Sequence, residues 1–258
     1  MITPASQPTQ PENQGQPGEP ALVIDGVVAG YGGGDVLRDV SFSVPEGSIT
    51  CVVGPNGAGK STVMRVISGL LRPRLGSVTL RGEKLVGKSP RQILKMGVVQ
   101  VPQNHSLFKD MTVRENLDLG GYTLSRPMVA RRRAHVEEMF PQVMGWAGMM
   151  AGSLSGGQQR LVEFARALML DPVLVLLDEP SMGLSPMVLR SVFAAAKQMN
   201  TNGATVLLVE QNARAGLKLA HHGVVMENGT VRLTGSGREV LEHPEIGELY
   251  LGGAAKRQ

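Results

Sequence analysis

One nine-residue stretch, residues 54–62, limits the possible folds of this chain more than any other part of it. The segment fits the pattern G-x-x-x-x-G-K-[ST]. The apolar, β-branched run at residues 49–53 predicts a buried strand before it, and apolar residues at helical spacing over 63–70 predict a helix after it. A strand, a glycine loop and a helix in this order point backbone N–H groups and a helix N-terminus at one place, which suits a polyphosphate. We therefore expect a nucleotide site formed by Gly54, Pro55, Asn56, Gly57, Ala58, Gly59, Lys60, Ser61 and Thr62.

Two side chains of this loop would carry the chemistry. Lys60 would bring a positive charge to the β- and γ-phosphates, and the Ser61 hydroxyl would ligate Mg²⁺. The alternative interpretation is an ordinary glycine-rich turn without a ligand. The flanking strand and helix make that alternative the weaker one.

Composition narrows the class of protein. The chain has 258 residues, enough for one large domain or a domain with a subdomain, and its hydrophobic share of 42% is typical of a globular protein. No apolar run approaches the roughly 20 residues of a membrane helix, and no secretory signal is visible, so we expect a cytoplasmic chain. The single cysteine, Cys51, excludes an internal disulfide and is expected to be buried. The net charge of +4 does not distinguish a nucleic-acid partner from an anionic membrane surface, or either of these from a charge that only keeps the chain soluble.

The remaining segments predict an α/β chain with attached parts. Residues 1–20 are rich in Pro, Gln, Ser and Thr and are expected to be disordered. Short β-like runs over 21–44 and 76–82 predict a small antiparallel sheet, and residues 112–150 favour helices. The arginine triplet at 131–133 indicates a solvated helix face rather than a nucleic-acid patch, because no aromatic residues interleave with it. A hairpin is expected around Asn228-Gly229, then a helix over about 236–250.

Three further positions point to a ligand. Tyr31, next to a glycine cluster, is a candidate to stack on a base, although a half-exposed structural tyrosine is about as good an interpretation. The run Ser155-Gly156-Gly157 opens a helix and predicts a second anion-binding helix start, although it could also be a simple loop. The strand predicted at 173–177 ends in Asp178 and Glu179, where acidic side chains would hold Mg²⁺ and polarise an attacking water, respectively.

Four segments in order resemble the ATP-binding subunits of ABC transporters. They are residues 54–62 as Walker A, Gln103 as the Q-loop, Leu154–Arg160 as the signature, and Val173–Pro180 as Walker B. The resemblance covers residues 21–253, leaving tails at 1–20 and 254–258. It implies an α/β P-loop NTPase fold: a RecA-like core with an antiparallel β-subdomain and a helical subdomain at about 104–160.

The resemblance also implies the cofactors, ATP and Mg²⁺, and residue roles. Two ATPase subunits would close head to tail on two ATPs, each held by residues 54–62 of one chain and by Ser155, Gly156 and Gly157 of the other. Tyr31 would then stack on the base. Asp178 and Ser61 would ligate Mg²⁺, Glu179 would be the general base, and Gln103 would sense the γ-phosphate and the metal. Lys60 completes the catalytic set.

One position departs from the family. The switch histidine that should follow the strand at 205–209 is Gln211 here. A glutamine amide can still donate a hydrogen bond to a phosphate oxygen, but it carries no titratable charge. Three segments resemble the shorter ATPase of branched-chain amino-acid importers: Leu208–Ala213, which contains Gln211, residues 181–186, and the ending at 243–253.

Several alternatives stay open at this stage. Gln103 fits the general family better than that subfamily, where an acidic residue followed by glycine is expected, so importers of urea or short-chain amides remain candidates. A soluble ABC ATPase acting on nucleic acid or ribosomes, a small-molecule kinase and an exporter ATPase are weaker alternatives. The expected partners are transmembrane permease subunits, a second ATPase subunit and, indirectly, a solute-binding protein, at the cytoplasmic face of the membrane. Nucleic acid is not expected.

Overall fold

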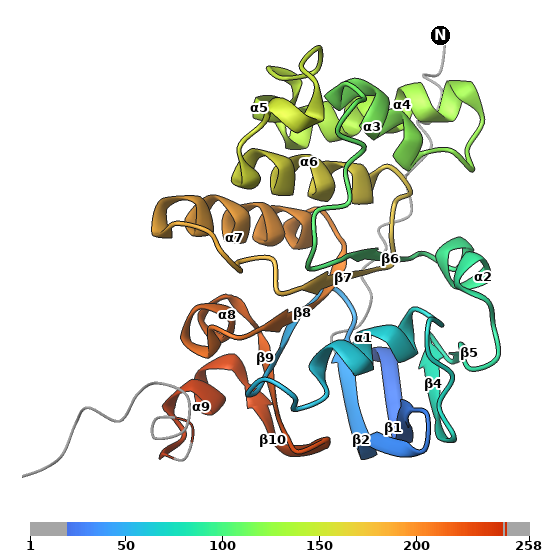
Figure 1. Cartoon of the computed structure of the whole chain (residues 1–258), viewed down its shortest axis with the longest axis vertical. Helices are drawn as coiled ribbons and strands as arrows, with labels where there is room; N and C mark the ends of the chain where they lie inside the picture. The colour runs from blue at the N-terminus through green and yellow to red at the C-terminus, as the bar shows by residue number, and fades with distance from the viewer. Residues whose placement is uncertain (1–19, 245, 247–258) are drawn as a thin grey trace, which may run out of the picture.

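The computed structural model describes residues 20–244 and 246 (Figure 1). The predicted disorder of residues 1–20 therefore falls outside the described residues except for Pro20, which begins a strand. The C-terminal tail at 254–258 falls outside them as well. In the part that is described, no helix has both the length and the apolar character needed to cross a bilayer.

A six-stranded sheet forms the centre of the molecule, in the order β10-β9-β3-β8-β7-β6. Its strands β3, β6, β7, β8 and β9 run parallel, and β10 closes one edge as an antiparallel hairpin with β9. The continuous apolar runs predicted strands of this kind, because both faces of a parallel sheet are covered. The bounds are β3 Ile49–Val53, β6 Val98–Val101, β7 Leu174–Asp178, β8 Thr205–Glu210, β9 His222–Glu227 and β10 Thr230–Ser236.

A second, antiparallel sheet has the order β2-β1-β4-β5, which confirms the small sheet expected from the sequence. Two of its strands are longer than the short runs suggested: β1 (Pro20–Tyr31) and β2 (Gly34–Pro45) have 12 residues each. Register shifts interrupt their pairing, and these irregularities break the alternation that marks a strand in sequence. The other strands are β4 (Leu75–Leu80) and β5 (Glu83–Lys84).

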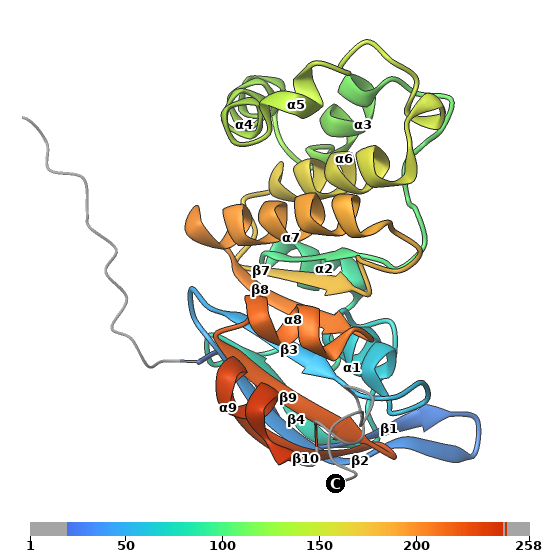
Figure 2. The same ribbon diagram turned by 90° about the vertical axis from the view of Figure 1, so that its left-hand side faces the viewer.

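Helices cover both faces of the central sheet (Figures 1 and 2). Helix α1 (Lys60–Ile67) packs with the antiparallel sheet on one face, and α6 (Gly156–Leu168) and α7 (Pro186–Thr201) cover the other. Beyond α6 lie α3, α4 and α5, which confirms the helices predicted over 112–150, whereas the subdomain boundaries at 104 and 160 stay a prediction. The bounds are α2 Pro90–Lys95, α3 Val113–Gly120, α4 Arg126–Met139, α5 Pro141–Met144, α8 Ala213–Leu219, α9 Gly237–Glu242 and a 3₁₀ turn Ala151–Ser153.

In the expected C-terminal helix over about 236–250, Pro244 and Ile246 are helical, and residues 245 and 247–250 lie outside the described residues. The helix is nevertheless not continuous: α9 ends at Glu242, and His243 has extended backbone angles (φ −65°, ψ 130°). The cause is Pro244, since the residue before a proline is pushed out of the helical region. The start was correct: Ser236 accepts a hydrogen bond from the backbone of Glu239 and caps α9.

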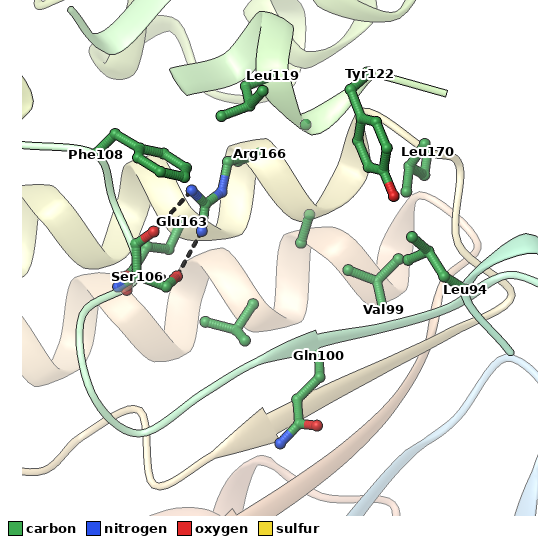
Figure 3. Close-up of a pocket in the computed structure, with 13 residues that line it drawn as sticks. Leu94, Val99, Gln100, Ser106, Phe108, Leu119, Tyr122, Glu163, Arg166 and Leu170 are labelled. Carbon is green, nitrogen blue, oxygen red and sulfur yellow. Dashed lines mark hydrogen bonds between the residues drawn. The ribbon is translucent and has the colours of Figure 1, made fainter. Parts of the chain in front are cut away.

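The helical layer leaves an apolar pocket of about 420 Å³ beside β6 (Figure 3). Its walls come from β6, the segment that follows β6, and helices α3 and α6. Phe108 and Tyr122 are exposed at this pocket, and the charged side chains of Glu163 and Arg166 lie in its wall.

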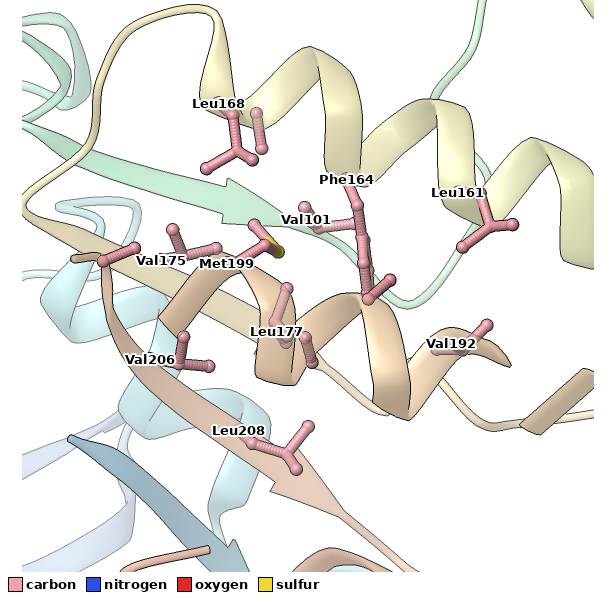
Figure 4. Packing of buried hydrophobic residues seen from close by; sticks show 14 of the residues in the cluster. Val101, Leu161, Phe164, Leu168, Val175, Leu177, Val192, Met199, Val206 and Leu208 are labelled. Carbon is pink, nitrogen blue, oxygen red and sulfur yellow. The ribbon is translucent and has the colours of Figure 1, made fainter. Parts of the chain in front are cut away.

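The core splits into two parts because side chains of the central strands alternate between the faces of the sheet. Along β7, Leu174 and Leu176 join the core that contains α1, whereas Val175 and Leu177 pack toward α6 and α7. Figure 4 shows the second core, where Phe164 of α6 lies among side chains of the sheet and α7. Both cores therefore meet at the sheet that carries the predicted site residues.

Candidate active site

The loop at 54–59 joins β3 to α1 and confirms the predicted strand–loop–helix unit. Gly57 and Gly59 have φ angles of 82° and 101°, in the left-handed region that favours glycine. A Cβ on Gly54 would lie 2.3 Å from the Met226 carbonyl oxygen. No side chain caps the start of α1, so its first N–H groups point into the site without a side-chain acceptor.

Lys60 is buried at the bottom of this loop. Its Nζ donates hydrogen bonds to the carbonyl oxygens of Gly54 at 2.8 Å and Pro55 at 3.1 Å, and it lies 3.6 Å from Glu179 Oε1. The ammonium group is thus held between the loop and a carboxylate, at the place where phosphates would enter.

Asp178 and Glu179 stand at the carboxyl end of β7, next to the loop. The Ser61 hydroxyl lies 3.4 Å from Asp178 Oδ1. Burial, and next the neighbouring Glu179 charge, raise the pKa of Asp178, while the Ser61 hydroxyl and Lys60 offset part of that rise. A hydroxyl and a carboxylate whose charge is disfavoured are hard oxygen ligands that fit a Mg²⁺ ion.

Glu179 has a strained backbone. Its φ of 44° lies in the left-handed region, and its N–H donates to the Val209 carbonyl at 2.9 Å. This conformation aims a buried carboxylate at Lys60 and at Gln103, whose Nε2 donates to Glu179 Oε2 at 3.0 Å and approaches Met182 Sδ at 2.9 Å. Residues 60, 103 and 179, far apart in sequence, therefore meet.

Gln211 joins the same pocket from the segment after β8. The pocket has a volume of about 390 Å³ and is walled by side chains of the loop, Gln103, Glu179 and Gln211. Its walls also include Val36 and Met182. The sequence analysis assigned neither residue to the site. Val36 comes from β2 and carries no local signal for a ligand, and the apolar side chain of Met182 carries none either.

Tyr31 lies outside these walls. It is 48% exposed at the end of β1, and the Arg65 guanidinium stands 5.7 Å from its ring centroid. A cation over an aromatic face is a stabilising contact, so the ring has a partner already. The stacking role of Tyr31 stays a prediction.

The signature residues also lie outside the pocket walls. Ser155 caps α6: its hydroxyl accepts from the Gln158 N–H, and Gln158 Oε1 accepts from the Ser155 N–H at 2.9 Å. Ser155 and Gly156 are exposed, and Gly157 is buried against Val188 of α7, where an added Cβ would lie 2.1 Å from Cγ1. Within one chain, the two predicted anion-binding regions therefore do not share a pocket.

Glu210, the last residue of β8, connects the segment after β7 to the segment after β8. This buried carboxylate accepts hydrogen bonds from the Ser181 N–H at 3.2 Å and the Ser181 hydroxyl at 2.6 Å. Burial raises the pKa of Glu210, and the Ser181 bonds offset part of the rise. The segment after β7 is thereby tied to the segment that carries Gln211.

Comparison with known proteins gives one consistent family. The sequence profile of the ABC transporter family matches residues 37–182. The high-affinity branched-chain amino acid transport ATP-binding protein BraG of Pseudomonas aeruginosa is 39% identical over 232 residues, which span 90% of this chain and 100% of BraG. The high-affinity branched-chain amino acid transport ATP-binding protein LivG of Salmonella typhimurium is 32% identical over 254 residues, which span 92% of this chain and 99% of LivG.

Solved structures agree with the sequence matches. The ADP conformation of an ATP-binding cassette of an ABC transporter has a TM-score of 0.83 with 30% identity and covers 91% of this chain and 100% of that chain. A nucleotide-free ATP-binding cassette has a TM-score of 0.81 with 31% identity over the same shares of the two chains. The α/β P-loop NTPase fold expected from the sequence is confirmed.

Proposed function

The chain belongs to the ABC transporter family as an ATP-hydrolysing subunit, and from this premise we propose that it energises the import of branched-chain amino acids. The full-length similarity to BraG supports the substrate class. The observation that carries the enzymatic mechanism is the meeting of Lys60, Gln103 and Glu179 in one pocket.

In this mechanism Glu179 is the general base. Its carboxylate takes a proton from a water molecule while the water oxygen attacks the γ-phosphorus, and the bond to the bridging oxygen breaks to release ADP and phosphate. Lys60 leaves the loop carbonyls to bind the β- and γ-phosphates, and Gln103 orients the water through the amide that contacts Glu179. Gln211 donates its amide N–H to a γ-phosphate oxygen.

Ser61 and Asp178 would hold Mg²⁺, whose charge would stabilise the phosphate oxygens during transfer. Their spacing of 3.4 Å and the raised pKa of Asp178 support this assignment. The backbone of residues 54–59, with Thr62 and the N-terminus of α1, binds the phosphates. Tyr31 turns from Arg65 to the base when nucleotide binds.

A second ATPase subunit completes each site. Ser155, Gly156 and Gly157 lie outside the pocket of their own chain, which supports a role toward the nucleotide of a partner chain. Exposure of Ser155 and Gly156 at the start of α6 fits such a contact.

The transmembrane permease docks at the apolar pocket beside β6, and a solute-binding protein acts through that permease. Phe108 and Tyr122 give this pocket exposed aromatic side chains, and Phe108 follows Gln103 closely in the chain. A partner in the pocket would therefore contact the segment that carries Gln103. We propose with it that the chain works at the cytoplasmic face of the membrane.

The test is reconstitution with the permease subunits and the solute-binding protein of a branched-chain amino-acid importer. We expect leucine-, isoleucine- or valine-loaded binding protein to stimulate ATP hydrolysis, and the Glu179→Gln variant to abolish it. Stimulation by urea or a short-chain amide, with none by the three amino acids, would contradict the proposed substrate class.

A further inference from the structure

Helix α6 holds the Gln103 segment through three charged side chains. Arg160, Glu163 and Arg166 are spaced three residues apart and lie along the face of α6 that contacts residues 102–106. None of the three was assigned a role by the sequence motifs. The contacts join a helix to a loop almost 60 residues earlier in the chain.

Arg160 fixes the backbone on both sides of the Pro102–Gln103 peptide bond. Its NH1 donates to the Pro102 carbonyl at 2.8 Å, and its NH2 donates to the Gln103 carbonyl at 2.6 Å. NH1 also pairs with Glu163 Oε2 at 2.9 Å, and the two side chains are only 3% and 1% exposed. The planar guanidinium holds both carbonyls in a fixed geometry.

Glu163 and Arg166 hold the next turn of the same segment. Glu163 Oε1 accepts the Ser106 N–H, and Arg166 NH1 donates to the Ser106 carbonyl at 2.9 Å, with NH2 on the Ser106 hydroxyl (Figure 3). His105 Nδ1 lies 3.4 Å from Glu163 Oε2. The backbone is thus bound at residues 102, 103 and 106, while the Gln103 side chain reaches in the other direction to Glu179.

Stability does not account for this arrangement. A buried ion pair loses its hydration on folding, and well-packed apolar side chains of similar size commonly stabilise a protein as well or better. Among the described residues, Arg160 Nε has no hydrogen-bond partner, and burial lowers the pKa of Arg160. What apolar side chains could not supply are the donors and the acceptor that orient the loop backbone.

We propose that Arg160 and Glu163 are positioning residues for ATP hydrolysis, which fix the backbone of residues 102–106 so that the Gln103 amide stays on Glu179. The inference rests on the role of Gln103 in the proposed function. Neither residue touches the nucleotide pocket, so both act through Gln103. They set the rate of the chemical step and leave ATP binding unchanged.

The main test is the double variant Arg160→Met/Glu163→Leu, which replaces the pair by apolar side chains of similar volume. We expect its unfolding midpoint to fall, because the carbonyls of Pro102 and Gln103 and the Ser106 N–H lose their partners, so kinetics are measured at a temperature where the variant is fully folded. Its KM and ATP affinity should stay within about twofold of the parent. Its kcat is expected to fall at least about tenfold, because small displacements of a catalytic group slow a reaction by one to two orders of magnitude. Arg160→Lys serves as a second variant: it keeps the charge beside Glu163 but cannot hold two carbonyls.

A cycle with Gln103→Ala distinguishes positioning from a general structural role. If Arg160 and Glu163 act through Gln103, adding their substitutions to Gln103→Ala lowers kcat no further. Phe164→Leu, which shortens a buried side chain of the same helix outside this contact, is the control and should destabilise the protein while leaving kcat close to the parent.

The outcomes distinguish a failure of the positioning role of Arg160 and Glu163 from a failure of the role of Gln103. If Gln103→Ala lowers kcat but neither Arg160 variant does, or if the effects multiply in the combined variant, the positioning role is wrong and the proposed function stands. If Gln103→Ala keeps the parental kcat, the assigned role of Gln103 is wrong, and the positioning role is wrong with it. A matched loss of kcat without additivity supports the inference.

Discussion

At the scale of single residues, Gln211 places an amide that does not titrate where the family has a histidine, and this affects the pH dependence of ATP hydrolysis. It lines the pocket with Lys60 and Glu179, and its amide has no proton to gain or lose near neutral pH. A histidine at this position would titrate near pH 6.5 in the absence of other influences.

We therefore expect Gln211→His to add a limb to the pH profile of kcat between about pH 5.5 and 8. The measurement is steady-state ATPase activity of parent and variant over this range, with Gln211→Asn as the control that keeps an amide. An identical profile for parent and histidine variant would contradict a γ-phosphate contact at this position.

Asp178, the proposed Mg²⁺ ligand, is expected to lower the free energy of unfolding when its carboxylate is ionised and no metal is bound. Its pKa is raised by burial and by Glu179, so the ionised form disfavours folding; stability is highest when the group is protonated and falls as pH rises through the folded-state pKa. We expect Asp178→Asn to melt higher than the parent in nucleotide-free protein at pH 8, by a margin that shrinks as pH falls through that pKa. Hydrolysis should be lost.

The measurement is thermal unfolding from pH 4 to 8 without nucleotide or metal. Asp25→Asn, which replaces an exposed aspartate outside the pocket, is the matched control for the substitution itself. A lower melting temperature for Asp178→Asn at pH 8 would show that the ionised carboxylate stabilises the fold.

The packing of α6 on α7 is the element-scale feature that ties the signature to the core. Gly157 lies against Val188, and a Cβ at this position would stand 2.1 Å from Val188 Cγ1. Gly157→Ala is expected to destabilise the protein by about 1–3 kcal/mol through overpacking, and adding Val188→Ala should restore part of the loss.

Urea unfolding of these variants gives the measurement. Gly148→Ala is the matched control, since an added Cβ there meets no atom within 4 Å. Equal effects of the two glycine substitutions would contradict close packing of α6 on α7 in solution.

Local sequence patterns predicted two units of the fold correctly. The strand–loop–helix unit around Lys60 and the hairpin at Asn228-Gly229 were confirmed, because the signal for each lies in one continuous stretch of sequence. The lengths of β1 and β2 were missed because irregular pairing breaks the alternation of side chains. The break in the C-terminal helix at His243 was missed although Pro244 was visible in the sequence.

Contacts between distant segments could not be predicted from such patterns. The motif residues were recognised separately, but the hydrogen bond from Gln103 to Glu179 depends on the pairing of β6 with β7, which brings the ends of the two strands together. The left-handed backbone of Glu179, whose N–H donates to Val209 of β8, had no signal in the sequence either. Arg160 was recognised only as the last residue of the signature segment, and its contacts could not be foreseen because its partners are carbonyl groups of a different loop.

At the scale of the whole molecule, the pocket around Lys60 and the signature residues 155–157 are separate within one chain. The pocket around Lys60 includes none of residues 155–157, and these residues stand at the exposed start of α6. In the two-chain site proposed above, a second ATPase subunit brings its signature onto the nucleotide bound by the first. Removing the carboxylate of Glu179, the proposed general base, should stall hydrolysis and trap that closed pair.

The measurement is the mass of the Glu179→Gln variant in solution, by size-exclusion chromatography with light scattering. It is made with and without Mg-ATP, for the chain alone and mixed with a second ATPase subunit of a branched-chain amino-acid importer. We predict an ATP-dependent dimer in at least one of the two samples, and its loss when Gly156→Asp blocks the signature. A variant that binds ATP yet stays monomeric in both samples would contradict the two-chain site.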